Sequence, residues 1–224
     1  MIKAVIFDMD GIIIDSEPYW RKAIPEVLST IGITLDEKQA MQTTGLRVEE
    51  VVHYWYKRHA LTEPSPDTVA LKITERVIDY IMKYGKIMDG LKHVFSVVQN
   101  RGIPLALASS SRYVLIDAVV DSLDVRSYFD VIHSAEEESH GKPHPGVYLS
   151  AARKLNTPPY ACLAVEDSLA GVIAAKAARM ACIAKPEYYH DHDKGFCIAD
   201  RVVDSLHTID EKMLREIESE RTDG

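Results

Sequence analysis

The carboxylates Asp8 and Asp10 stand two residues apart, directly after the apolar residues 4–7 and directly before Gly11. If residues 4–10 are extended, both side chains lie on one face, about 6.6 Å apart along the strand, and they repel each other. A divalent cation relieves such repulsion, and a glycine behind the pair lets the backbone turn tightly toward a ligand. The stretch therefore points to chemistry at the end of a buried strand.

Four interpretations of this acid pair compete. It can be a turn whose acids merely face solvent. A calcium loop is excluded, because its fifth and sixth positions need an acid or asparagine and then glycine, where Ile12 and Ile13 stand. A dinucleotide-binding loop is excluded, because no G-x-G-x-x-G pattern follows. The fourth is a carboxylate nucleophile beside a second carboxylate acting as acid and base, which requires anion-stabilising groups at neighbouring strand ends.

Groups of that kind follow later apolar runs of the chain. Residues 109–111 are all serine, and hydroxyls with backbone N–H groups at a helix start suit a phosphate. Lys142 lies in a turn fixed by two prolines, and the acids Glu166 and Asp167 end another apolar run. Each feature alone has an ordinary explanation as a helix cap or a solvated side chain. Their joint occurrence, each after its own strand, favours the nucleophile interpretation.

The elements that must position these residues follow from the hydrophobic pattern. Short, mostly continuous apolar runs alternate with segments whose apolar residues recur at spacings of three and four. We expect strands at residues 4–8, 103–109, 129–134, 162–167, 181–186 and 200–205. We expect helices at residues 91–102, 112–123, 145–155 and 169–180. This alternation predicts an α/β fold with a Rossmann-like parallel-sheet core, in which ligands bind beyond the carboxyl ends of the strands.

Residues 16–88 interrupt the alternation, because their apolar residues recur at helical spacing and no convincing strand is present. We expect an inserted helical cap domain here, so that residues 1–15 and 89–224 form the α/β catalytic core. Pro25 lies inside the first helical pattern of the insertion and predicts a kink or break. The polar residues 216–224 are expected to fray.

The composition limits the possible partners. The chain of 224 residues is 46% hydrophobic with a formal net charge of −8, so its surface does not attract polyanions and we expect no nucleic-acid partner. No apolar run approaches the roughly 20 residues of a membrane span, and no signal-peptide pattern opens the chain. Three cysteines without metal-ligand spacing fit a reducing compartment. We expect a cytoplasmic monomer without a membrane partner.

Four motifs, taken together and in order, make the chain resemble the haloacid dehalogenase superfamily. They are DMDG at 8–11, SSS at 109–111, Lys142 in GKPHP, and EDS at 166–168. The resemblance covers nearly the whole chain, and the set is highly specific although each motif alone is weak. The helical insertion is similar to the cap of the subgroup containing β-phosphoglucomutase and sugar phosphatases. The segments DMDGIIIDSEPYW, GLRVEEVV, AKAARM and KPHPGVYL are similar to bacterial hexitol and 2-deoxyglucose-6-phosphate phosphatases.

The resemblance implies a role for each matching residue. Asp8 would attack phosphorus and form an aspartyl-phosphate. Asp10 would protonate the leaving alkoxide and then deprotonate the attacking water. Ser109 and Ser110 would hold the phosphoryl oxygens, and Lys142 would offset their charge. This division of roles fits the physics of phosphoryl transfer, which depends on positioning and on electrostatic stabilisation.

The resemblance also implies Mg²⁺ as cofactor. The ion would lie between Asp8, the backbone carbonyl of Asp10, Asp167 and a phosphate oxygen. Glu166 would support the ion, either directly or through water.

Several activities of the family remain to be separated. Dehalogenases of the superfamily lack the second acid and the metal, so Asp10 argues against that activity. β-Phosphoglucomutase carries a histidine that assists the proton relay at the position matched here by Trp20. Tryptophan cannot do that chemistry, so we expect Trp20 to be an apolar wall of the cleft or part of the cap core. Its presence favours hydrolysis.

Specificity is expected to come from the cap. The segment TTGLR resembles the subgroup's substrate loop, which makes Gly45, Leu46 and Arg47 candidates for contacts with the leaving group. Glu17 and Trp20 lie at the hinge and are further candidates for substrate contact.

We expect a Mg²⁺-dependent phosphatase of a small sugar phosphate or sugar-alcohol phosphate. The alternatives are a β-phosphoglucomutase-type phosphomutase and a non-catalytic module that binds sugar phosphates.

Overall fold

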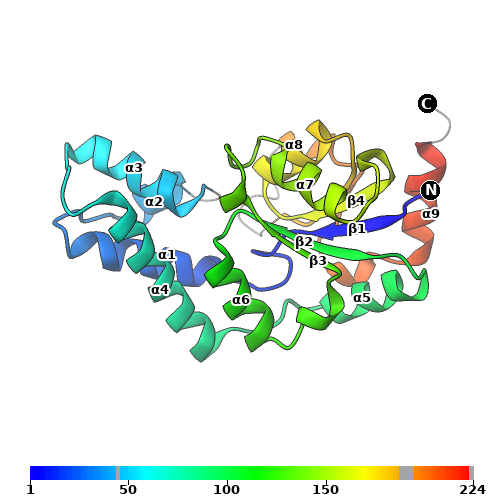
Figure 1. The fold of residues 1–224 in the computed structure, drawn as a ribbon, viewed down its shortest axis with the longest axis horizontal. Helices are drawn as coiled ribbons and strands as arrows, with labels where there is room; N and C mark the ends of the chain where they lie inside the picture. The colour runs from blue at the N-terminus through cyan, green and yellow to red at the C-terminus, as the bar shows by residue number, and fades with distance from the viewer. Residues whose placement is uncertain (44–45, 187–193, 222–224) are drawn as a thin grey trace.

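The computed structural model describes residues 1–43, 46–186 and 194–221. Its centre is a parallel sheet of six strands in the order β3-β2-β1-β4-β5-β6 (Figure 1). The strands are β1 (Ala4–Phe7), β2 (Leu105–Ser109), β3 (Val131–Ser134), β4 (Cys162–Glu166), β5 (Ala181–Ala184) and β6 (Arg201–Val202). The predicted α/β fold with a parallel core is therefore confirmed.

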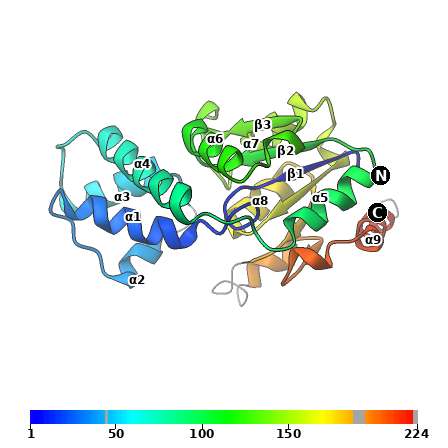
Figure 2. The same cartoon turned by 90° about the horizontal axis from the view of Figure 1, so that it is seen from below.

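Helices occupy two regions of the chain. Those before residue 85 are α1 (Glu17–Ser29), α2 (Glu37–Ala40), α3 (Val48–His59) and α4 (Pro66–Tyr84). Those that alternate with the strands are α5 (Leu91–Asn100), α6 (Tyr113–Ser122), α7 (Gly146–Lys154), α8 (Leu169–Ala177) and α9 (Glu211–Glu220). Short 3₁₀ turns are η1 (Met41–Thr43), η2 (Arg126–Tyr128), η3 (Ala135–Glu137), η4 (Pro159–Ala161), η5 (Lys194–Ile198) and η6 (Leu206–Thr208). Helices α1 to α4 lie together at one end of the molecule, beside the sheet (Figures 1 and 2).

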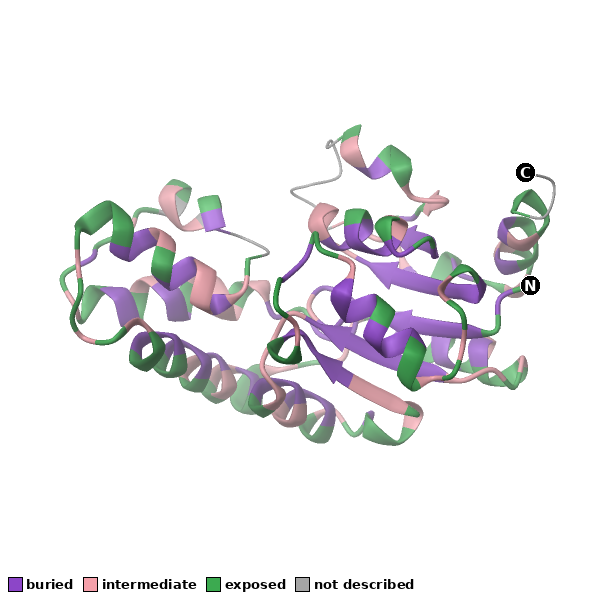
Figure 3. Cartoon of the chain, turned by 45° about the horizontal axis from the view of Figure 1, so that its top comes forward, coloured by how far each residue is buried: buried purple, intermediate pink, exposed green. Residues whose placement is uncertain are grey.

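The two faces of the sheet carry side chains of different size. One face presents larger side chains such as Phe7, Leu107 and Val165, which pack against α5, α6 and α9. The other presents small ones such as Ala106 and Ala164, against which α7 and α8 pack. Both faces are covered at the centre of the sheet, so the four central strands β2, β1, β4 and β5 are wholly buried, whereas the edge strands β3 and β6 are partly exposed (Figure 3). This burial explains why the strands are continuous apolar runs in the sequence.

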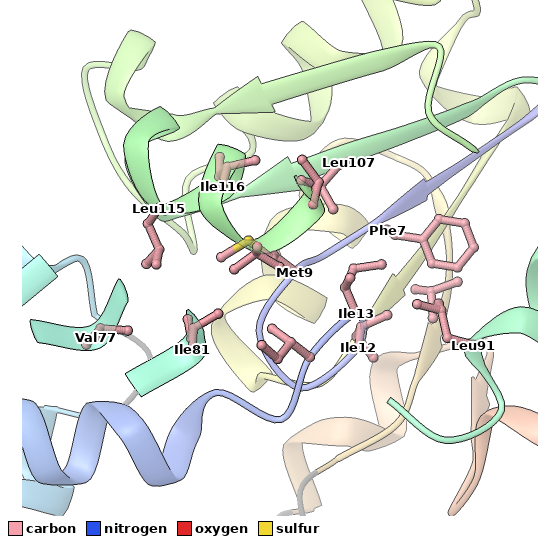
Figure 4. Close-up of a cluster of buried hydrophobic side chains, with 14 of the residues drawn as sticks. Phe7, Met9, Ile12, Ile13, Val77, Ile81, Leu91, Leu107, Leu115 and Ile116 are labelled. Atoms are coloured by element: carbon pink, nitrogen blue, oxygen red, sulfur yellow. The ribbon is translucent and has the colours of Figure 1, made fainter. Parts of the chain in front are cut away.

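The helical insertion is joined to the core by apolar packing as well as by the chain. Helix α4 contacts α6, and both belong to one hydrophobic cluster with the sheet. Figure 4 shows Val77 and Ile81 of α4 close to Leu115 of α6 and to Met9 after β1. The insertion therefore packs onto the same core that supports the strand ends.

Two local expectations need correction. Helix α1 continues past Pro25 to Ser29, so the expected break does not occur, while a kink there stays a prediction. Residues 216–220 do not fray, because they belong to α9, which buries Leu214 and Ile217 against the core. Glu218 of this helix also accepts hydrogen bonds from the backbone N–H of Ile2 and the guanidinium of Arg101.

Within the described residues, no helix has the length and apolar character needed to cross a bilayer.

Candidate active site

Three neighbouring strands bring the motifs together at one edge of the sheet. Asp8 follows the last residue of β1, Ser109 ends β2 and Glu166 ends β4. Strand β1 lies between β2 and β4, with Phe7 in register with Leu107 on one side and Val165 on the other. The carboxyl ends of parallel strands meet at the same edge, so the predicted residues converge there.

A tight turn after β1 sets the position of Asp10. The Ile13 N–H donates to the Met9 carbonyl at 2.8 Å, and the Gly11 N–H donates to the Ile14 carbonyl at the same distance. Gly11 adopts φ +73°, and a Cβ atom there would lie 2.1 Å from Oδ2 of Asp167. Only glycine accommodates both this backbone conformation and the close approach of the Asp167 carboxylate.

Lys142 is buried between the carboxylates of two strands. Its Nζ donates to Asp8 Oδ1 at 2.6 Å and also to Glu166 Oε1. Burial alone would lower the pKa of Lys142, but the charges of Asp8 and Glu166 outweigh burial and raise this pKa above its ordinary value. Lys142 is therefore a permanently charged ammonium between two acids.

Glu166 is fully occupied by donors. Besides Lys142, the Tyr148 hydroxyl donates to Oε1 at 2.6 Å, and Oε2 accepts the backbone N–H groups of Asp167 and Ser168 at 3.0 Å each. Burial raises the pKa of Glu166, but the charge of Lys142 and these donors outweigh burial and leave it below the ordinary value. Gly171 of α8 makes room for this carboxylate, since a Cβ there would lie 1.7 Å from Oε1.

The negative charges of Asp8 and Asp167 are less well compensated by nearby donors and cations than that of Glu166. Burial raises the pKa of Asp8 to about 7 against the opposing charge of Lys142, and Glu166 and Asp10 contribute to the rise. Burial, followed by the charges of Glu166 and Asp8, raises the pKa of Asp167 well above its ordinary value. Among the described residues, no hydrogen bond reaches Oδ2 of Asp8 or the Asp167 carboxylate.

These acids fit a divalent cation. Asp8, Glu166 and Asp167 each place a carboxylate oxygen within 4.8 Å of the others. Carboxylate oxygens are the hard ligands that Mg²⁺ prefers. Oδ2 of Asp8 and the Asp167 carboxylate accept no hydrogen bond from a described residue, so they are available to bind such a cation. Because donors already occupy Glu166, this residue fits a supporting position better than a direct ligand.

The carboxylate of Asp10 is held by three donors from two parts of the fold. Its Oδ1 accepts the Ser16 hydroxyl and the Trp20 indole N–H, the latter at 3.3 Å. Its Oδ2 accepts the Ser111 hydroxyl at 3.2 Å. Ser16 and Trp20 belong to the start of α1, and Ser111 follows β2 in the core. The orientation of Asp10 is thus set jointly by the insertion and the core.

The serines after β2 divide into two kinds. Ser109 is wholly buried, and its Oγ accepts the backbone N–H of Ser111 at 3.0 Å, which fixes the turn. Ser110 and Ser111 line the cavity beside Asp8. Because Ser111 gives its backbone N–H to Ser109 and its hydroxyl to Asp10, Ser110 is the serine better placed to donate to a bound anion.

A cavity of about 320 Å³ lies between the strand ends and the insertion. Asp8, Asp10, Lys142 and Asp167 line its core side. The predicted cap residues that line the other side are Glu17, Trp20, Leu46 and Arg47. Gly45 lies outside the described residues. Glu17 also forms an ion pair with Arg21 at 3.1 Å.

Two arginines join the insertion to the core at the cavity rim. Arg47 precedes α3, and its guanidinium donates to the Ala135 carbonyl at 3.3 Å. The same side chain lies against Gly141, where a Cβ would be 2.7 Å from Arg47 Nε. Arg112 of the core pairs with Glu49 of α3. Arg47 is therefore next to the loop that carries Lys142, as well as at the cavity.

Sequence reasoning did not assign site contacts to Ser16 and Tyr148, and it placed Ser111 among the phosphate donors rather than beside Asp10. The Tyr148 hydroxyl reaches Glu166 from a helix in which the tyrosine counted only as an apolar residue. Ser16 stands at the N-cap of α1 but its side chain does not cap the helix. A serine at a helix start whose hydroxyl can reach an acid six residues earlier is the signal that was available.

Comparison with known proteins establishes the family. A family model of haloacid dehalogenase-like hydrolases matches residues 2–179. The chain belongs to this family, as the four motifs predicted. Hexitol phosphatase B of Escherichia coli K12 is 37% identical over 206 residues, covering 92% of this chain and 93% of the relative. Fructose-1-phosphate phosphatase YqaB of the same strain is 31% identical over 181 residues, covering 79% of this chain and 92% of the relative.

Solved structures agree with the fold. β-Phosphoglucomutase from Clostridium difficile superposes with a TM-score of 0.86 at 26% identity, and all of both chains is covered. CbbY from Rhodobacter sphaeroides in complex with phosphate gives a TM-score of 0.84 at 29% identity, covering 96% of this chain and all of CbbY. The relatives thus include phosphatases of sugar phosphates and structures named for a mutase.

Proposed function

We propose that the chain is a Mg²⁺-dependent phosphatase that hydrolyses a small sugar phosphate or sugar-alcohol phosphate through an aspartyl-phosphate on Asp8. The observation that carries the proposal is the buried Asp8 carboxylate, held by Lys142 at 2.6 Å and facing a cavity that the helical insertion covers. The sugar-phosphate class is supported by the names of the curated relatives, which act on hexitol phosphate and fructose 1-phosphate.

The reaction proceeds in two displacements at phosphorus. Asp8 attacks phosphorus, and the bond between phosphorus and the ester oxygen breaks. Asp10 gives a proton to the departing alkoxide, so that an alcohol leaves. Asp10 then accepts a proton from water, which attacks the aspartyl-phosphate and releases phosphate and free Asp8. The bonds from Ser111, Ser16 and Trp20 orient Asp10 for both transfers.

The charges of the site stabilise the phosphoryl group during transfer. Lys142 stays charged and lies beside Asp8. Ser110 offers hydroxyl and backbone donors after β2. Asp8, Asp167 and the Asp10 carbonyl would hold Mg²⁺, with Glu166 in support; when bound, the cation supplies Lewis-acid stabilisation of negative charge on the phosphoryl oxygens.

The proposal includes the division of the chain. Residues 16–88 act as a cap over a core of residues 1–15 and 89–224, and the cap carries the substrate contacts of Glu17, Leu46 and Arg47. The helices α1 to α4 and the cavity beneath them support this division. We further propose a monomer in the cytoplasm, as the sequence predicts.

The direct test compares Asp8→Asn with a matched control, Asp15→Asn. Asp15 is an exposed acid on the same segment and does not line the cavity. We expect Asp8→Asn to lower turnover of p-nitrophenyl phosphate and of a panel of sugar and polyol phosphates by about 1,000-fold or more, with Asp15→Asn unchanged. EDTA should abolish wild-type turnover and Mg²⁺ should restore it. Turnover that survives Asp8→Asn, or that needs no metal, contradicts the mechanism.

The structural likeness to β-phosphoglucomutase supports a phosphomutase as second candidate. A mutase returns the phosphoryl group to a sugar rather than to water. Incubation with β-glucose 1-phosphate and a bisphosphate activator distinguishes the two activities, because a phosphatase yields free phosphate and a mutase yields glucose 6-phosphate. We expect free phosphate.

A further inference from the structure

Trp20 does more in the structure than line the cavity. Its indole N–H points to Oδ1 of Asp10 at 3.3 Å, and the ring packs against the hydrophobic core cluster. The Trp20 backbone N–H donates to the Ser16 carbonyl, so both side chains lie on one face of the first turn of α1. The start of the insertion thus places two donors on the same carboxylate oxygen of Asp10.

The second tryptophan of the chain provides an internal comparison. Trp55 of α3 is buried among apolar side chains, and no described residue accepts a hydrogen bond from its indole N–H. Trp55 thus packs in the insertion with no hydrogen-bond acceptor for its indole N–H among the described residues. The indole N–H of Trp20, in contrast, donates to Asp10, the acid assigned to proton transfer.

We infer that Trp20 is a positioning residue, which holds the Asp10 carboxylate in the orientation that delivers its proton to the leaving oxygen. The inference rests on the proposed function. Indole N–H is a donor only, so Trp20 orients Asp10 without taking or sharing the transferred proton. Without it, Oδ1 keeps the Ser16 hydroxyl and Oδ2 the Ser111 hydroxyl at 3.2 Å, and the carboxylate is less restrained. General-acid catalysis is sensitive to such a loss, because the acid must stay within hydrogen-bond reach of the leaving oxygen.

The test uses two leaving groups with different needs for a proton. p-Nitrophenolate leaves without protonation, whereas the alkoxide of sorbitol 6-phosphate, or of the panel's fastest polyol or sugar phosphate, does not. The ratio kcat/KM reports only steps up to release of the leaving group, so later water attack does not enter. For Trp20→Phe, which keeps an apolar ring, we expect a loss of about tenfold with the alkyl phosphate and less than about twofold with p-nitrophenyl phosphate.

The matched control is Trp55→Phe, the same substitution in the same insertion at an indole N–H that has no acceptor among the described residues. We expect Trp55→Phe to affect the two substrates equally. Equal losses for the two substrates in Trp20→Phe, or a loss confined to KM of the alkyl phosphate, would overturn the inference and leave Trp20 as a wall of the cavity.

Asp10→Asn separates failure of this inference from failure of the proposed function. We expect that variant to lose about 100-fold or more with the alkyl phosphate and much less with p-nitrophenyl phosphate. If Asp10→Asn shows no such contrast, the proton transfer assigned to Asp10 is wrong. If Asp10→Asn shows the contrast and Trp20→Phe does not, only the role of Trp20 is wrong.

Discussion

Replacing Lys142 by methionine removes the ammonium that separates two buried carboxylates. Lys142 donates to Asp8 at 2.6 Å and to Glu166, and all three side chains are nearly inaccessible to solvent. Methionine preserves most of the side-chain volume, so the loss is mainly one of charge and hydrogen bonds. Two carboxylates then remain buried without their cation, in addition to the nearby Asp167.

Removing one partner of a buried ion pair costs about 3–5 kcal/mol in the free energy of unfolding. For a chain of this size, each kcal/mol corresponds to roughly 2–4 °C in Tm, so we expect Lys142→Met to lower Tm by about 10 °C in EDTA. Adding Mg²⁺ should recover part of this difference, because a cation near Asp8 and Asp167 offsets the carboxylate repulsion that Lys142 no longer relieves.

Urea unfolding followed by circular dichroism measures the free energy of unfolding, and a thermal scan measures Tm, each with EDTA and with Mg²⁺. Lys185→Met is the matched control, since among the described residues the Lys185 ammonium donates only to the Gly11 carbonyl, at 3.4 Å, and the side chain is half-buried. The double variant Lys142→Met/Glu166→Gln should regain stability over the single variant, because one buried charge is then removed. A cost for Lys142→Met within about 1 kcal/mol of Lys185→Met, or no extra stabilisation by Mg²⁺, would refute the reasoning.

Two further predictions concern Gly11 and Asp200. Gly11→Ala combines a strained φ of +73° with a Cβ 2.1 Å from Asp167, so activity should need at least about tenfold more Mg²⁺. Gly32→Ala is the control, because Gly32 has φ +85° but open space around its Cβ position, so this variant shares only the backbone strain. It should leave the Mg²⁺ requirement unchanged. Asp200 is partly buried, and although burial raises its pKa, the hydrogen bond from Lys176 helps to leave the pKa below its ordinary value. A lowered pKa stabilises the fold above the unfolded pKa of about 3.9, and this contribution is lost as pH falls through the folded pKa. Asp200→Asn should therefore lower the free energy of unfolding measured in urea at pH 7, and by progressively less below about pH 4. A deficit that is the same at pH 3 and pH 7 would contradict this reasoning.

The strands were predictable from sequence because burial on both faces leaves a continuous apolar run. The rule that ligands bind at the carboxyl ends of parallel strands then placed Asp8 and Glu166 at one edge, although 158 residues separate them (166 minus 8). The helical insertion was visible for a similar reason, since residues 16–88 lack any strand-like run.

Contacts that depend on side-chain direction across a turn were not predictable. The bond from Trp20 to Asp10 requires the compact turn after β1 to return the chain, so that the first turn of α1 faces the strand end. Helix α9 was missed because most of its residues are polar and its apolar face is short, with Leu214 and Ile217 buried and Met213 partly buried against the core. Glu211 and Glu218 of this helix pair with Arg101, which is 110 and 117 residues away in the sequence. Local sequence patterns do not predict contacts over such separations.

The charges at the strand ends also imply an order of binding. Three carboxylates, those of Asp8, Glu166 and Asp167, lie around one ammonium, that of Lys142, so the cluster has a net charge of −2 when all three are ionised. The raised pKa values of Asp8 and Asp167 show that this state is costly without a cation. A phosphate ester near neutral pH is itself close to a dianion, and an ionised cluster of the same sign repels it in a buried site. A divalent cation would neutralise the cluster, after which Lys142 and the serine donors favour the phosphoryl group. We therefore expect apparent affinity for the phosphate ester to rise with Mg²⁺ concentration, and inhibition by inorganic phosphate to be weak in EDTA.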